Sequence, residues 1–148
     1  MAGTLDDDAA IDDFTGTTPW HLWAIGAVAF LWNCVPAVDS TATLLHMAGW
    51  TSNVDPGILT KIYSAPIWAN ISWLCGGWGG LVGAILLLSR SRFAQYGFIT
   101  SLAGAAISFS WQFSVGLQSS PVLPAIILAS EIFFWWYAGK MRDAGVLT

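Results

Sequence analysis

Two acidic residues, Asp39 and Glu131, stand inside long apolar stretches of this chain without a Lys or Arg beside them. A carboxylate that enters hydrocarbon without a cationic neighbour usually marks a ligand site or a proton relay. We therefore treat both residues as candidates for ligand binding or proton coupling. Asp39 lies toward the end of its stretch, where water reaches it. Glu131 lies near the middle of its stretch and is expected to be a neutral, structural acid.

Amide and aromatic side chains accompany the two acids. Asn33, Asn70 and Gln112 fall in the outer halves of their stretches, and Trp32 and Trp111 lie next to two of them. Aromatic walls suit sugar faces and cations, and a few convergent polar groups orient a small ligand. The set predicts an outward-facing polar pocket for a small polar ligand. The alternative is that these groups hydrogen-bond between helices and only stabilise the fold.

Catalytic and metal-binding patterns are missing from the sequence. It has no H-E-x-x-H or C-x-x-C motif, and no Ser, His and Asp that would fall in one layer of the fold. Cys34 and Cys75 stand mid-stretch, where a free cysteine usually behaves as a small apolar residue. We therefore expect no enzyme activity, no metal site, no cofactor and no nucleic-acid partner.

Four apolar stretches must hold these residues, and crossing a bilayer as a helix takes about 20 residues. Of the 148 residues, 55% are hydrophobic and 9% are charged, a composition that needs lipid as solvent. Short connections make neighbouring helices antiparallel. The sequence thus predicts an all-α integral membrane protein, a bundle of four antiparallel transmembrane helices at about 20–45, 66–88, 93–117 and 122–138.

The segments outside these stretches complete the domain organisation. Residues 1–17 are predicted to be an acidic, flexible cytoplasmic tail, and residues 18–148 the transmembrane domain. In the first outer connection, Asp55 followed by Pro56 is typical of a helix start and predicts a short interfacial helix. Positive charges gather on one side of the bundle, which places both termini in the cytoplasm. They are Arg90, Arg92, Lys140 and Arg142, against Lys61 on the other side.

Small residues recur at helical spacing in the second and third stretches. Because lipid removes the hydrophobic drive between helices, small residues that let backbones approach usually form the contact. We predict that these two helices pack through such residues. The same glycines would alternatively admit a ligand or contact a second protomer. The packing residues are Gly76, Gly80, Gly83, Gly97 and Gly104.

Short motifs of the chain are similar to those of a known family. Residues 18–23 read TPWHLW, residues 31–33 read LWN and residues 78–80 read WGG. With these motifs the chain resembles the small four-helix bacterial inner-membrane proteins that are often named sugar transporters. The resemblance implies the fold, a bacterial inner (plasma) membrane and shared positions at Asn33, Asp39 and Thr43.

Two functions fit these expectations. The first is binding or transport of a small solute through the outward-facing pocket. Four helices are few for a complete transport path, so a homodimer would help to form it. The second is that of an accessory or structural subunit, which packs against a larger membrane complex through its glycine or tryptophan faces. The lipid bilayer is a partner in both.

Overall fold

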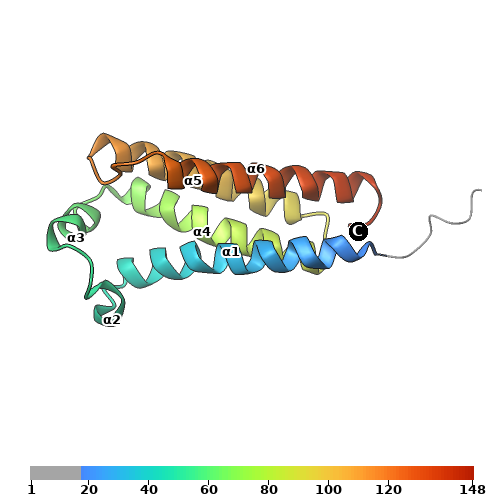
Figure 1. The fold of residues 1–148 in the computed structure, drawn as a ribbon, viewed down its shortest axis with the longest axis horizontal. Helices are drawn as coiled ribbons and strands as arrows, with labels where there is room; N and C mark the ends of the chain where they lie inside the picture. The colour runs from blue at the N-terminus through green and yellow to red at the C-terminus, as the bar shows by residue number, and fades with distance from the viewer. Residues whose placement is uncertain (1–17) are drawn as a thin grey trace, which may run out of the picture.

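The computed structural model describes residues 18–148, and in this range all regular secondary structure is α-helical. The tail predicted at residues 1–17 lies outside the described residues. The all-α fold class predicted from the sequence is therefore confirmed for the described part. Its six helices are α1 (Trp20–Leu44), α2 (Ala48–Thr51), α3 (Pro56–Tyr63), α4 (Ile67–Leu88), α5 (Ala94–Ser114) and α6 (Val122–Asp143) (Figure 1).

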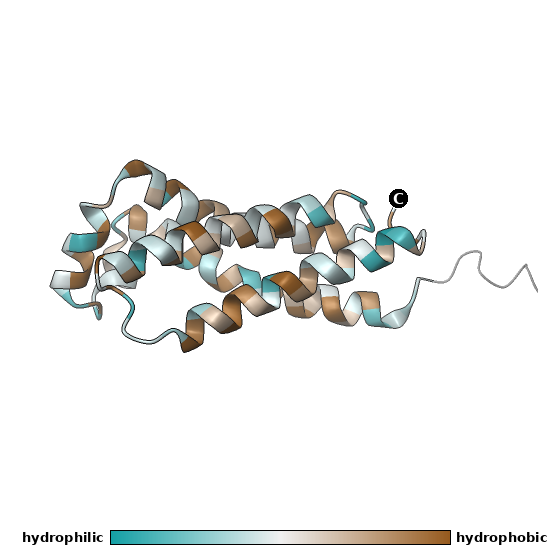
Figure 2. Cartoon of the chain, turned by 90° about the horizontal axis from the view of Figure 1, so that it is seen from above, coloured by the Kyte–Doolittle hydropathy of each residue, from teal (hydrophilic) through white to brown (hydrophobic). Residues whose placement is uncertain are grey.

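Three of these helices are long and apolar enough to cross a membrane: α1 with 25 residues, and α4 and α6 with 22 residues each. Hydrophobic residues recur along the length of the long helices (Figure 2), and many large apolar side chains are exposed, as contact with lipid requires. α5 is similar in length, at 21 residues, but hydroxyl and amide side chains such as Ser108 and Gln112 recur along it. The described residues thus form a membrane-embedded helical protein with three candidate spans.

The four long helices lie side by side, with α4 between α1 and α5, and with α6 against α5 (Figure 1). Each runs antiparallel to the next. One end of the bundle carries α2 and α3 and is called the α3 end. The opposite end carries the start of α1 and the C-terminus and is called the terminal end.

The helix limits follow from local chemistry. Asp55 begins α3 as predicted, because its Oδ1 accepts hydrogen bonds from the backbone N–H groups of Gly57 (2.8 Å) and Ile58 (3.2 Å). The fourth long helix continues to Asp143 instead of ending near residue 138, with Lys140 in its last turn, where cations are favourable. The four-residue α2 was not predicted, since it is too short to show a period.

Glycines bring α4 and α5 together at close range. A Cβ atom added to Gly97 of α5 would lie 2.6 Å from the backbone nitrogen of Gly83. One added to Gly104 would lie 2.6 Å from the backbone nitrogen of Gly76. Both distances are far below van der Waals contact, so the two backbones meet with no side chain between them.

The apolar core fills the terminal end of the bundle. Buried side chains from the four long helices and from the C-terminal segment meet there, among them Leu22, Leu87, Phe98, Phe134 and Leu147. Each is at most 5% exposed. The largest buried apolar side chains therefore lie at the terminal end, whereas polar side chains gather toward the α3 end.

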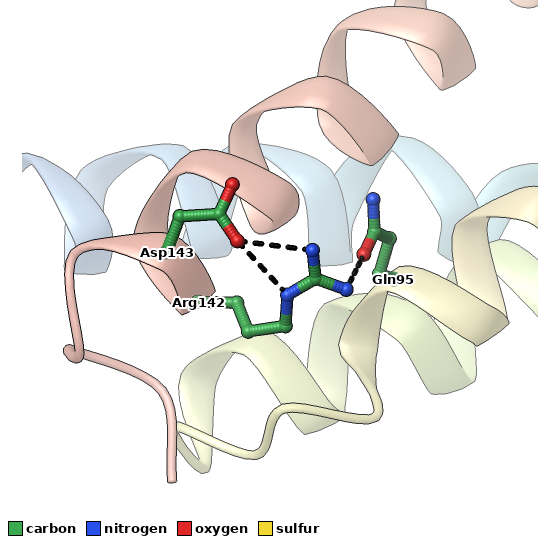
Figure 3. A network of polar contacts seen from close by, with 3 residues as sticks. All are labelled: Gln95, Arg142 and Asp143. Carbon is green, nitrogen blue, oxygen red and sulfur yellow. Dashed lines mark hydrogen bonds and ion pairs between the residues drawn. The ribbon is translucent and has the colours of Figure 1, made fainter.

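Polar contacts close the terminal end around this core. The backbone N–H of Thr148 donates to the carbonyl of Arg90 at 2.8 Å, which holds the C-terminal segment on the α4–α5 turn. The guanidinium of Arg142 donates to Gln95 Oε1 at 2.6 Å and to Asp143 Oδ1 at 2.9 Å (Figure 3). Since the Arg142–Asp143 pair is largely exposed, its main effect is to orient Arg142 toward α5.

Candidate functional site

A cavity of about 210 Å³ lies at the α3 end of the bundle. It is enclosed by α1, α3, α4 and α5, by the segment before α3 and by the connection after α5. Apolar side chains of α3 form one wall. The polar and aromatic lining residues are Asp39, Thr43, Asn70, Trp73, Ser108, Trp111, Gln112 and Gln118.

Hydrogen bonds orient part of the polar lining. Gln112 Nε2 donates to Ser108 Oγ at 2.9 Å, and Gln112 Oε1 accepts from Gln118 Nε2 at 2.8 Å. Asp39 Oδ1 accepts from the indole N–H of Trp50, in α2, at 2.9 Å. The second oxygen of the Asp39 carboxylate is not used in any hydrogen bond to residues 18–148, so it remains available for a ligand.

The helix α3 covers the cavity and is attached on both sides. At its end, the ring of Tyr63 stacks on His46, which follows α1, with ring centroids 3.8 Å apart and planes 13° apart. On the other side, Lys61 Nζ donates to the carbonyl of Val115, just after α5, at 3.0 Å. Both contacts are at the surface. The cover is therefore held by two local surface contacts and not by a buried network.

The charge of the cavity is negative. Asp39 alone carries a charge among the described lining residues, and the other polar lining groups are hydroxyls and amides. Charge interactions are stronger in a partly enclosed site than in bulk water, because the surrounding protein and lipid are less polarisable. The site therefore favours a cation or an uncharged polar molecule and disfavours an anion.

A second group of polar residues lies deeper in the bundle. The side chains of Asn33 on α1 and Ser101 on α5 face the carboxyl group of Glu131 on α6. All three residues are at most 1% exposed. Gly80 of α4 borders this group, because a Cβ there would overlap with the amide of Asn33 and would lie 3.0 Å from Ser101 Oγ. We call Asn33, Ser101 and Glu131 the buried cluster.

The structure thus divides the candidate residues between two places. Asp39, Asn70, Trp111 and Gln112 line the cavity, together with Trp73. Asn33 and Glu131 belong to the buried cluster and do not line the cavity.

Trp32 belongs to neither place, since its side chain is 38% exposed on the surface of α1. The sequence predicted the helix α3 but none of its lining side chains, nor Gln118, because these residues belong to connections rather than to apolar stretches. Ser101 and Ser108 are small polar residues that follow the spacing of the α5 glycines. Their shared α5 face, seven residues apart, was the available signal.

Comparison of this chain with protein-family models, with curated proteins and with solved structures finds no match. The cavity and the buried cluster are therefore interpreted from the chemistry of their own residues. The resemblance to four-helix transporters stays a prediction.

Proposed function

We propose that this chain is a polytopic membrane protein that binds a small polar solute, uncharged or cationic, in the cavity at the α3 end, as a step in its transport. The observation that carries the proposal is the convergence of Asp39, Asn70 and Gln112 with Trp73 and Trp111 around one space. Carboxylate and amide groups orient a polar ligand, while indole faces pack on the apolar faces of sugars and on cations.

The size of the cavity supports a small ligand. At about 210 Å³, it exceeds the cavity of roughly 150 Å³ that binds one benzene molecule. It is smaller than the pockets of drug-sized ligands, which begin at about 300 Å³. A polyol no larger than a monosaccharide, or a small quaternary ammonium ion, meets both limits.

The hydroxyl groups of α5 support its role as a fourth span. Thr100 Oγ1 donates to the carbonyl of Tyr96 at 2.8 Å, and Ser110 Oγ donates to that of Ala106 at 2.7 Å. Both hydroxyls are on the exposed side of the helix. A hydroxyl that is bonded within its own helix presents no unsatisfied donor to lipid, so these residues are tolerated in a bilayer.

The charges at the two ends support one orientation. Arg90, Arg92, Lys140 and Arg142 lie at the terminal end, whereas Lys61 lies at the α3 end. By the positive-inside rule, the terminal end faces the cytoplasm and the cavity faces outward. The resemblance to the small four-helix bacterial proteins supports the bacterial inner membrane as its location.

Binding to the purified protein in lipid nanodiscs tests the proposal. Choline serves as a cationic probe, glucose as an uncharged polyol and acetate as a small anion. We expect choline or glucose to raise the midpoint of thermal unfolding in a saturable way and to change tryptophan fluorescence, because a ligand that binds the folded state stabilises it. Acetate should do neither.

Matched variants link that binding to the cavity. Asp39→Asn should weaken choline binding at least tenfold, and Trp111→Leu should weaken binding of either active probe. The controls are Asp143→Asn and Trp136→Phe, which remove a charge and an indole far from the cavity. The proposal is wrong if no probe binds saturably, or if the cavity variants bind as the controls do.

A further inference from the structure

Few hydrogen-bond donors face the carboxyl group of Glu131. Ser101 Oγ donates its single proton to the carbonyl of Gly76 at 2.5 Å. Asn33 Nδ2 donates one of its two protons to the carbonyl of Ala29 at 3.0 Å. One amide proton is therefore left for both oxygens of Glu131, and its Oε2 has no partner among the described residues. An ionised carboxylate accepts up to about four hydrogen bonds, so this form is poorly satisfied here.

The same surroundings suit a carboxyl group that carries a proton. Ser101 Oγ and Asn33 Oδ1 are acceptors with free lone pairs, and both lie in the space beside Gly80. A protonated Glu131 can donate its O–H to either of them. A hydrogen-bonded neutral acid is much less costly to bury than an unpaired charge.

No opposite charge among residues 18–148 compensates Glu131. Within the described residues, α4 and α5 contain no Asp, Glu, Lys, Arg or His. On α1, His21 bonds the hydroxyl of Tyr137 at 2.6 Å, and Asp39 bonds Trp50. The other titratable residues of α6 lie toward the terminal end; they are Tyr137, Lys140, Arg142 and Asp143. When Glu131 gains or loses a proton, the net charge of the buried cluster therefore changes by one, and no neighbouring ion compensates it.

We propose that the buried cluster is a proton-binding site, separate from the cavity, at which Glu131 takes up and releases one proton. In the release step, the O–H bond of the carboxyl group breaks, its electron pair stays on the carboxylate, and the proton passes to a water molecule. Uptake is the reverse. Ser108 lies seven residues after Ser101 on the same face of α5 and lines the cavity, so the cavity is the polar space toward which this face leads. The inference does not depend on solute binding.

The chain offers an unusually direct test, because Glu131 is its single glutamate. Cell-free synthesis with glutamate labelled with carbon-13 at the side-chain carboxyl marks this residue alone. Infrared spectroscopy of the labelled protein in nanodiscs then separates the C=O stretch of the protonated acid from the bands of the carboxylate. We expect the protonated band at neutral pH, its loss at higher pH and its return when the pH is lowered.

Two variants distinguish the site from an isolated buried acid. Ser101→Ala removes one acceptor, so the frequency of the labelled band and the midpoint of its titration should both shift. Ser110→Ala, a matched change on the exposed side of the same helix, should leave both unchanged. Glu131→Gln should lose the band and, if it folds, keep a similar unfolding midpoint, because its amide also donates to the same acceptors.

Three results would overturn the proposal. The first is that the labelled protein gives no protonated band. The second is that the band stays constant at every pH at which the protein remains folded, because the acid then forms a fixed structural hydrogen bond. The third is replacement of the protonated band by the carboxylate bands when sodium chloride is added at constant pH, which means that a metal cation, not a proton, occupies the cluster. Each result is obtained on the wild-type chain and is independent of any ligand of the cavity.

Discussion

The amide oxygen of Asn33 occupies the space that a side chain at Gly80 would fill, so that α4 accepts the Asn33 side chain because residue 80 has no Cβ. This contact connects the two features that the sequence treated separately, the glycines of α4 and the polar residues of α1. The glycine permits the polar side chain to enter the interior, and the polar side chain then faces Glu131 across the bundle. Packing and polarity are therefore coupled at one level of the fold.

Substitution of Gly80 by Ala should destabilise the protein. A Cβ overlaps with the Asn33 amide and lies 3.0 Å from Ser101 Oγ, so the Asn33–Ala29 hydrogen bond must break or the helices must separate. Overpacking of this kind costs about 1–3 kcal/mol. Thermal unfolding in detergent measures the loss. Gly49→Ala is the control, because nothing lies within 4 Å of a Cβ there; equal unfolding midpoints for the two variants would contradict the prediction.

Gly104→Ala should cost more than Gly80→Ala. A Cβ at Gly104 would lie 2.6 Å from the backbone nitrogen of Gly76 and 2.7 Å from the carbonyl oxygen of Ser72. These are backbone atoms, which cannot rotate away as the end of the Asn33 side chain can. We expect a lower unfolding midpoint and weaker α4–α5 contact, measured by faster backbone hydrogen exchange in both helices. A variant as stable as Gly80→Ala would show that α5 shifts easily along α4.

The positions of the helices could be predicted from the sequence because lipid imposes a length on every apolar stretch. The start of α3 was predictable for a local reason, since Asp55 supplies the acceptor that the first N–H groups need. Hydropathy and length alone do not identify α5 as a candidate span. Its hydroxyls bond within the helix, which a scale based on composition does not register.

The division of the polar residues into two sites could not be predicted. Asn33 and Asp39 are six residues apart on α1, and at about 100° per residue they point in directions roughly 120° apart around the helix axis. The sequence gives the approximate depth of each residue in the bilayer, and by depth both Asn33 and Asp39 are expected in the outer half. Rotation of each helix about its axis, which depends on the glycine contacts with α4, decides which of them faces the cavity and which the buried cluster.

Loss of the Lys61 contact should loosen α3 without unfolding the bundle. Lys61→Met keeps the aliphatic stem but removes the hydrogen bond from Nζ to the carbonyl of Val115. Because the contact is exposed, the unfolding midpoint should change little. Backbone hydrogen exchange measured by mass spectrometry should instead become several times faster in α3 and stay unchanged in α4. Lys140→Met, at the other end of the bundle, is the control, and equal exchange in α3 of both variants would mean that Lys61 does not hold the cover.

Labelling from the two sides of the membrane tests whether α5 is a span. If it is, its two flanking connections lie on opposite sides, with Ser89 near the terminal end and Ser119 at the α3 end. In a background of Cys34→Ala and Cys75→Ala, we expect a membrane-impermeant maleimide to label Ser119→Cys in intact cells and Ser89→Cys only after the membrane is opened. The exposed side chains at both positions make the comparison direct. Labelling of both from the same side would mean that α5 does not cross the bilayer. The cavity would then have one wall outside the hydrocarbon, and the argument for an enclosed site for a small solute would fail with it.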